Sequence, residues 1–172
     1  MQQTYYIKLV NMEMYMKVEI PKGSSNKIEY NKDKKRFELD RVLSVSMSYP
    51  EEYGVIPETL APDGDELDVV CLTIQPTFFG LYVPIRIIGV LRMTDKGEQD
   101  DKLLAVNAGE PRLNYIQELK DVSLEKQREI KHFFSRYKDL ENKKVEIGEF
   151  EGREQAEKLL KDCQKAYQNE KE

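Results

Sequence analysis

Alternation of apolar and polar residues predicts short strands in the first two-thirds of the chain. They are expected at residues 15–20, 27–30, 36–39, 68–74, 83–93 and 103–106. The polar segment 22–26 and the charged segment 31–35 read as turns between the first three. No helical pattern separates these strands, which favours an antiparallel sheet or a small barrel over a parallel sheet with crossover helices.

In the last third of the chain the apolar period becomes that of a helix. A first helix is expected at 123–141, with Ser123 as its N-cap. Its apolar face consists of Leu124, Ile130, Phe133, Phe134, Tyr137 and Leu140. A second is expected at about 153–168, turning inward Ala156, Leu159, Leu160, Cys163, Ala166 and Tyr167. The tail 169–172 is expected to fray.

Length and composition indicate a single domain over residues 1–172. Apolar residues make up 40% and charged residues 34%, which suits a core under a heavily charged surface or site. The formal net charge of −5 argues against general nucleic-acid binding, which favours a basic face.

Three further observations predict a cytoplasmic protein. No apolar run approaches the roughly 18 residues needed to cross a bilayer. The segment Met1–Tyr6 lacks the charged and apolar regions of a signal peptide. Cys71 and Cys163 lie in apolar patterns and are expected to be reduced, buried thiols.

The acidic segment Asp63-Gly64-Asp65-Glu66-Leu67-Asp68, directly before an apolar strand, is the strongest candidate for chemistry. Carboxylate oxygens are the ligands that Mg²⁺ and Ca²⁺ prefer. Asp68 has the opposite strand parity to Asp63 and Asp65, so the chain must turn for all three to converge. The spacing does not match an EF-hand loop. A solvated turn is the alternative.

A second acidic loop, residues 94–102, makes a shared metal site more plausible than either loop alone. Lys27 and Glu29 point to one face of a strand. Tyr49 and Tyr53 lie on a proline-containing turn and offer hydroxyl donors to an anion. Lys138 lies beside the apolar helix face and can reach around it. Each of these is also compatible with an ordinary surface or core position.

Other common catalytic motifs are absent. The chain has no phosphate-binding Gly-x-x-x-x-Gly-Lys loop, no Cys-x-x-Cys pair and no Gly-x-Ser-x-Gly elbow. His132 is the single histidine, which excludes a His-rich zinc site, and its helical position suits a core edge or an interface.

These segments together resemble the soluble inorganic pyrophosphatases of family I. The acidic segment followed by Val69 matches that family's signature. Its other blocks occur in the same order over about residues 15–168: 18–21, 26–29, 39–41, 49–54, 89–95, 100–102, 132–134 and 137–140.

The resemblance implies an α+β fold: a five-stranded, OB-like antiparallel β-barrel with flanking helices. It also implies Mg²⁺-dependent hydrolysis of pyrophosphate to two phosphates, with several ions per site and Mn²⁺ as a possible substitute. Physically, a dense anion requires charge neutralisation on both phosphates, which metals and basic side chains supply.

The resemblance also implies roles for particular residues. Asp65 is the expected general base, and Tyr53, Arg41 and Lys27 assist catalysis. The expected substrate contacts are Lys27, Glu29, Arg41, Tyr53, Lys102, Tyr137 and Lys138, with Tyr49 supporting the cavity. The expected metal ligands, directly or through water, are Asp63, Asp65, Asp68, Asp95, Asp100 and Glu19.

Some positions depart from the family pattern: Ile28, Glu52, Lys96 and Phe150. Lys96 replaces an acidic residue and is expected to weaken or rearrange one metal site. The resemblance further implies a homo-oligomer, a hexamer if the protein is bacterial, with helix residues near His132 at an interface.

Two other functions fit parts of the pattern. A nucleic-acid-binding barrel without catalysis suits the aromatic strands but not the acidic loops. A phosphohydrolase acting on nucleotides or another phosphoanhydride suits the acidic loops, but no feature of the sequence provides for a base.

Overall fold

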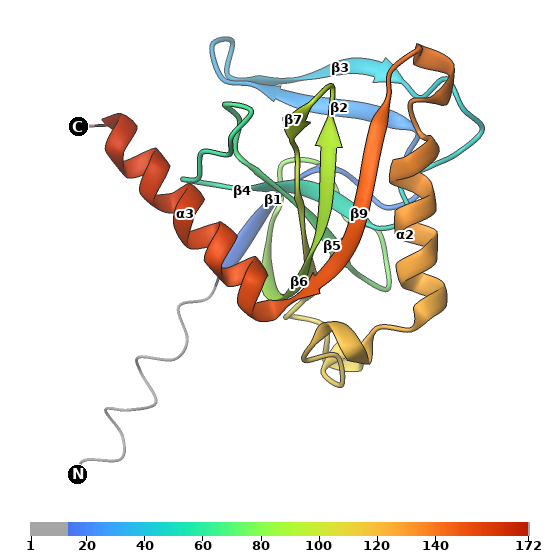
Figure 1. Ribbon diagram of the computed structural model, residues 1–172, viewed down its shortest axis with the longest axis vertical. Coiled ribbons are helices and arrows are strands. Elements are labelled where there is room, and N and C mark those ends of the chain that lie inside the picture. Colours follow the sequence, from blue (N-terminus) through green and yellow to red (C-terminus); the bar gives the residue numbers. More distant parts are fainter. Residues whose placement is uncertain (1–13, 172) are drawn as a thin grey trace.

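A ring of five strands lies at the centre of the structure (Figure 1). In this computed structural model, which describes residues 14–171, the ring runs β1–β4–β5–β8–β6 and closes where β6 pairs with β1. Its strands are β1 (Met14–Ile20), β4 (Glu52–Ile56), β5 (Leu67–Leu72), β6 (Tyr82–Asp95) and β8 (Lys102–Asn107). This is the expected α+β, OB-like barrel.

One pairing of the ring corrects the expectation of a wholly antiparallel barrel. β5 and β8 are parallel, whereas the other four neighbouring pairs are antiparallel. Strand direction alternates around an antiparallel ring, so an odd number of strands cannot close without a parallel pair. A five-stranded closed barrel therefore requires this exception.

Three strands were not predicted from the sequence: β4, the two-residue β7 (Glu98–Gln99) and β9 (Val145–Gly152). β4 overlaps a segment interpreted as a turn. Its Glu52 is buried, and its carboxylate accepts hydrogen bonds from the backbone N–H of Thr77 at 2.6 Å and from the Thr77 hydroxyl at 3.2 Å. β9 pairs with the outer half of β6. Its glycines obscure the strand pattern, yet Gly148 is needed, because an added Cβ would lie 2.9 Å from Cβ of Arg92.

The hairpin β2 (Asn26–Asn31) and β3 (Arg36–Val42) forms a separate two-stranded sheet beside the ring. Phe37 packs on Tyr30 within the hairpin and on Phe79 outside it, with ring centroids 5.1 and 5.3 Å apart. The short β7 (Glu98–Gln99) pairs with the end of β6. These additions build up the side of the ring on which the acidic loops lie.

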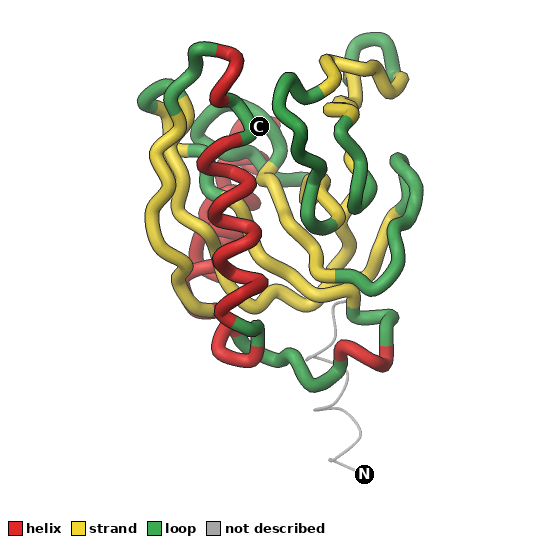
Figure 2. Tube along the Cα trace, turned by 90° about the vertical axis from the view of Figure 1, so that its right-hand side faces the viewer, coloured by secondary structure: helices red, strands yellow, loops and turns green. Residues whose placement is uncertain are grey.

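The helices α2 (Leu124–Arg136) and α3 (Arg153–Lys171) flank the barrel (Figures 1 and 2). Ser123 caps α2, accepting from the backbone N–H of Lys126. Leu124 and Leu140 are 63% and 68% exposed, so their predicted inward orientation is wrong: Leu124 begins the helix, and Leu140 lies beyond its end. α3 continues to Lys171, so the expected fraying of the tail is wrong for residues 169–171.

Single 3-10 turns connect the remaining segments. They lie at η2 (Pro111–Leu113), η3 (Leu119–Asp121) and η4 (Asp139–Glu141). The helix predicted to reach residue 141 ends at Arg136, and Tyr137 and Lys138 separate it from η4.

Two clusters of buried side chains fill the space between sheet and helices. One contains Ile130, Phe133 and Phe134 of α2. The other contains Ala156, Leu160 and Cys163 of α3. Cys71 and Cys163 are both buried and free, as predicted.

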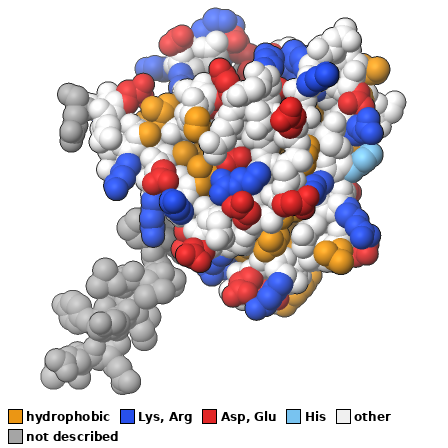
Figure 3. Space-filling model, in the orientation of Figure 1, with side chains coloured by type: hydrophobic (Ala, Val, Ile, Leu, Met, Phe, Trp, Pro, Cys, Tyr) orange, Lys and Arg blue, Asp and Glu red, His pale blue; other side chains and the backbone are white. Residues whose placement is uncertain are grey.

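The described surface carries charges of both signs. On the face shown in Figure 3, basic and acidic side chains are interspersed, without one extended basic area. No helix within residues 14–171 is long and apolar enough to span a membrane. The prediction made from Met1–Tyr6 falls outside the described residues.

Candidate active site

The structure brings all the residues predicted to bind substrate or metal, or to assist catalysis, to one cavity of about 450 Å³. The residues come from β1, β2, β3, β4, β5, β6 and β8, from the loops between them, and from the segment after α2. Tyr49 does not line the cavity: it is buried behind Tyr53, with ring centroids 5.2 Å apart. Segments more than a hundred residues apart therefore contribute to one site.

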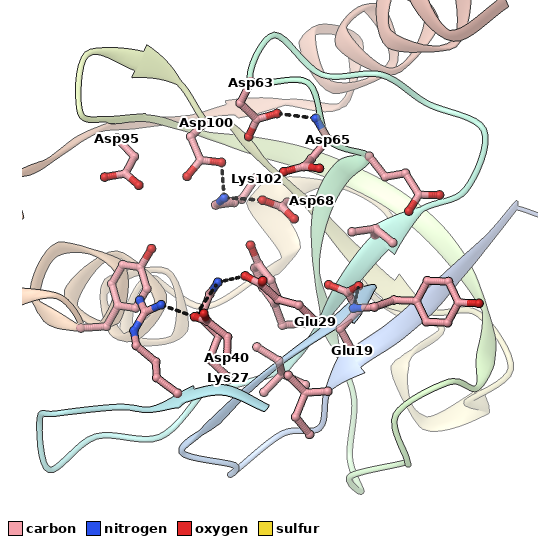
Figure 4. Close-up of a pocket in the computed structure, with 18 of the residues that line it drawn as sticks. Glu19, Lys27, Glu29, Asp40, Asp63, Asp65, Asp68, Asp95, Asp100 and Lys102 are labelled. Atoms are coloured by element: carbon pink, nitrogen blue, oxygen red, sulfur yellow. Dashed lines mark hydrogen bonds and ion pairs between the residues drawn. The ribbon is translucent and has the colours of Figure 1, made fainter. Parts of the chain in front are cut away.

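One wall of the cavity consists of the two acidic loops (Figure 4). Asp63 and Asp65 precede β5, and the chain turns at Gly64, whose φ is +89°. Asp63 Oδ1 accepts from the backbone N–H of Asp65 at 3.1 Å. Asp68 lies on β5 itself. This turn brings all three aspartates to one cavity, although Asp68 has the opposite strand parity to Asp63 and Asp65.

The second acidic loop is a tight hairpin between β6 and β7. Lys96 and Gly97 form its tip, both with positive φ, and Asp95 and Asp100 lie on either side. Lys96 is exposed at the cavity rim. The loop therefore places two carboxylates beside those of the first loop.

Lys102 is the buried cation between the two loops. Its side chain is 2% exposed, and its ammonium group donates to both Asp68 and Asp100. Burial acts to lower the pKa of Lys102, but these two carboxylates hold it above its ordinary value. Lys102 thus stays charged in the site.

The opposite wall comes from β1 and the β2–β3 hairpin (Figure 4). Lys27 pairs with Glu29 and lies 3.5 Å from Oδ2 of Asp40. Arg41 donates through Nε to Glu141 at 2.7 Å and through Nη1 to Asp40. Its Nη2 is buried and lacks a hydrogen-bond partner within residues 14–171. A buried donor without a partner lowers the stability of the folded state, so a ligand oxygen that accepts a hydrogen bond from Nη2 would bind favourably here.

Tyr53, Tyr137 and Lys138 complete the cavity. Burial holds the pKa of both tyrosines well above its ordinary value, so their hydroxyls remain donors. Tyr137 follows the last residue of α2, and its ring packs against Phe133 and Phe134. Lys138 donates to Asp95 Oδ2 at 2.5 Å.

Two carboxyls in this cavity have raised pKa values. Burial raises the pKa of Glu19 to about 7, against a hydrogen bond from the backbone N–H of Tyr30 and with a further rise from the charge of Asp68. Burial raises the pKa of Asp100 to about 6; Lys102 opposes this rise and Asp68 adds to it. In both cases burial is the main cause and the charge of Asp68 a smaller one, so the charged form of each carboxyl is destabilised in this cavity.

Several cavity residues had no assigned role in the sequence analysis. They are Asp40, Glu66, Lys32, Lys143 and Tyr30. Glu141, which holds Arg41, also went unnoticed. Asp40 and Glu66 lie inside recognisable motifs, whereas no local pattern marks Lys143 or Glu141.

The donor chemistry of the cavity fits divalent cations. Asp95 Oδ1 is buried without a hydrogen-bond partner among the described residues. Across residues 14–171, no three acidic, cysteine or histidine side chains converge as a ready-made ligand cage. Mg²⁺ uses one or two carboxylates and completes its shell with water and phosphate oxygens, which suits separated carboxylates around an open cavity.

Comparison with known proteins gives one consistent family. The profile described as inorganic pyrophosphatase matches residues 16–168. The chain is 47% identical over 154 residues to the inorganic pyrophosphatase of Geobacillus stearothermophilus, covering 90% of this chain and 93% of that one. It is 49% identical over 146 residues to that of Halalkalibacterium halodurans, covering 85% and 90%.

Solved structures agree in fold. The inorganic pyrophosphatase from Thermus thermophilus superposes with a TM-score of 0.87 at 39% identity, covering 90% of each chain. That from Helicobacter pylori gives 0.88 at 39% identity, covering 91% of this chain and 94% of the other.

Proposed function

Because the chain belongs to the inorganic pyrophosphatase family and hydrolyses pyrophosphate to two phosphates, we propose that the cavity described above is its Mg²⁺-dependent active site. One observation carries this proposal. Nine carboxylates and seven basic side chains, drawn from distant segments, line a single cavity. A pyrophosphate needs cations around both phosphates, and metals held by carboxylates add to those that the basic side chains provide.

Asp65, Asp68, Asp95 and Asp100 are the proposed magnesium ligands, with Asp63 and Glu19 acting through water. Bound Mg²⁺ neutralises phosphate charge and lowers the pKa of a water toward neutrality. The free Oδ1 of Asp95 and the raised pKa values of Glu19 and Asp100 support this assignment. Mn²⁺ is expected to substitute because it shares the preference for oxygen ligands.

The substrate lies between the acidic wall and the basic residues. Lys27, Arg41, Lys102 and Lys138 donate to phosphate oxygens, and the protonated hydroxyls of Tyr53 and Tyr137 add neutral donors. The unpartnered Nη2 of Arg41 is one such donor. Glu29 orients Lys27 through their ion pair. These contacts stabilise the charge that develops on the departing phosphate.

Asp65 acts as the general base. The water oxygen forms a bond to one phosphorus while its proton passes to the Asp65 carboxylate. The bond from that phosphorus to the bridging oxygen breaks, and the bridging oxygen leaves with the second phosphate. Two phosphates result from one pyrophosphate and one water.

A phosphate-release assay tests the proposal. Purified protein with pyrophosphate is expected to release phosphate in proportion to added Mg²⁺ and to stop in EDTA. ATP at the same concentration is the matched substrate, and slow release from it is expected because the cavity walls present charged groups rather than a surface for a base. Release that is unaffected by EDTA, or faster from ATP, would contradict the proposal.

The proposal also covers the oligomeric state and the cellular location. We expect a cytoplasmic homo-oligomer, a hexamer if the source is bacterial. His132 is exposed on α2 in the single chain, as expected for a residue that an oligomer interface would cover. Size-exclusion chromatography with light scattering tests the oligomer; a monomer at micromolar concentration would exclude it.

A further inference from the structure

Asp101 is a buried carboxylate on the far side of the acidic hairpin from the cavity. Its neighbours Asp100 and Lys102 line the cavity, whereas Asp101 does not. Successive side chains of an extended segment point to opposite sides, which accounts for this difference. The Asp101 side chain is only 4% exposed. Its ion-pair partner is Arg92, which does not line the cavity.

Three donors converge on this carboxylate. Oδ1 accepts from the backbone N–H of Met93 at 3.0 Å. Oδ2 accepts from Arg92 Nη1 and from Gln99 Nε2, each at 2.6 Å. Met93 lies before the hairpin tip and Gln99 after it, so Asp101 joins the two arms of the loop.

These contacts close the base of the hairpin that presents Asp95 and Asp100. Within the hairpin, Thr94 pairs with Gln99 and Asp95 with Glu98. A single backbone bond, from Asp100 N–H to Met93 O at 2.9 Å, lies next to the Asp101 contacts. The separation of Asp95 from Asp100 therefore depends on how this base is held.

Arg92 is itself held in place from β9. It donates to Glu151 Oε2 from Nε at 2.9 Å and from Nη2 at 2.6 Å. Gly148 leaves room for it, since an added Cβ there would lie 2.9 Å from Cβ of Arg92. The charge of Asp101 is thus balanced by an arginine outside the cavity, which leaves Lys102 and Lys138 to the site.

We propose that Asp101 is a positioning residue that holds Asp95 and Asp100 at the separation needed for divalent-metal binding. The proposal rests on the proposed role of those two residues as metal ligands. Groups that orient metal ligands control affinity, and their loss typically weakens binding by about 10- to 100-fold. Without Asp101, repulsion among the cavity carboxylates would open the hairpin.

The test measures Mn²⁺ binding directly, by electron paramagnetic resonance of the free ion in the absence of substrate. Asp101→Asn keeps the shape but turns an amide toward Arg92 and Gln99, and its Mn²⁺ affinity is expected to fall about tenfold. Activity should fall more at limiting than at saturating Mg²⁺. Glu149→Gln is the matched control, because it removes an exposed carboxylate of β9 that pairs with Lys131, and its affinity should stay within about twofold of wild type.

Wild-type Mn²⁺ affinity in folded Asp101→Asn would overturn the proposal, as would an equal loss in Glu149→Gln. If Asp101→Asn does not fold, Arg92→Lys decides, because a lysine cannot hold Asp101 and Glu151 together: weaker binding supports the proposal and unchanged binding overturns it. Asp100→Asn separates the premise from the inference. Unchanged Mn²⁺ affinity in Asp100→Asn would overturn the ligand assignment and the proposal with it.

Discussion

At the scale of single residues, Asp65 is exposed and also lines the cavity. It lies in the loop before β5, and its backbone N–H is bonded to Asp63. Removing the charge of an exposed carboxylate costs little folding energy, so function and stability can be separated at this position.

Asp65→Asn is expected to lower kcat by about 10²- to 10⁴-fold, because a general base contributes on that order. The unfolding temperature should change by less than about 2 °C, since surface substitutions have small effects on stability. Phosphate release and calorimetry measure the two effects. Asp33→Asn, an exposed turn residue of the β2–β3 hairpin, is the control for the same charge change. Near-normal turnover in folded Asp65→Asn would contradict the base role.

Glu19 makes the stability of the metal-free protein depend on pH. Its folded pKa is about 7 and its ordinary value 4.5. Between these values the folded state binds more protons than the unfolded state, so the free energy of unfolding falls as pH rises. The contribution is fully present below about pH 4.5 and lost by about pH 7, and a rise of this size corresponds to about 3 kcal/mol.

Urea unfolding in EDTA at pH 5 and pH 7.5 measures this difference. Glu19→Gln should reduce the loss and leave a smaller one of the same sign from Asp100, whose pKa is also raised. An unchanged pH dependence in Glu19→Gln would show that another group is responsible.

At the scale of elements, the close contact between the backbones of β4 and β1 restricts which residue can stand at position 54. Gly54 crosses β1 so closely that an added Cβ would lie 2.1 Å from the carbonyl oxygen of Lys17. The neighbouring Tyr53 contributes to the cavity. A side chain at this crossing would push β4 away from β1 and displace that tyrosine.

Gly54→Ala is therefore expected to lower the free energy of unfolding by about 3 kcal/mol, the upper end for overpacking. Gly152→Ala is the matched control, because its Cβ would meet nothing closer than 3.6 Å. Chemical denaturation compares the two variants. Equal stability of both would mean that the β1–β4 crossing relaxes freely.

Elements also show where prediction from sequence succeeded and failed. The strands with continuous apolar runs, such as β5 and β6, were predicted because burial on both faces leaves a clear local pattern. β4 and β9 were missed, because a buried Glu52 that accepts from Thr77 and a glycine that leaves room for Arg92 do not give the alternating apolar pattern of a strand. Both depend on partners far away in the sequence.

At the scale of the whole molecule, the cavity concentrates charge that bound metal relieves. A ligand that binds only the folded state stabilises it by about 2.7 kcal/mol at 100 times its dissociation constant. For a domain of this size, that corresponds to a rise of about 5–10 °C in unfolding temperature.

Calorimetry with increasing MgCl₂ should show this rise. KCl at equal ionic strength is the control, because screening alone reduces repulsion without occupying the site. Asp100→Asn should show a smaller rise with Mg²⁺. An equal rise with KCl would mean that no specific cation site exists.

The sequence by itself determined the chemical groups and their local arrangement. Residues 63–68 and 94–102 place carboxylates within a few positions of one another, and this proximity follows from covalent connection. The same holds for the helical periods of α2 and α3. For this reason the acidic loops, the basic residues and the family resemblance can all be recognised in the amino-acid sequence.

Only the tertiary structure decided which of these groups meet. Lys138 and Asp95 are 43 residues apart and come into contact because the segment after α2 lies against the end of β6. The parallel β5–β8 pair and the outward direction of Asp101 follow from ring closure and strand register. Contacts of this kind depend on packing over long sequence separations, which local patterns do not record.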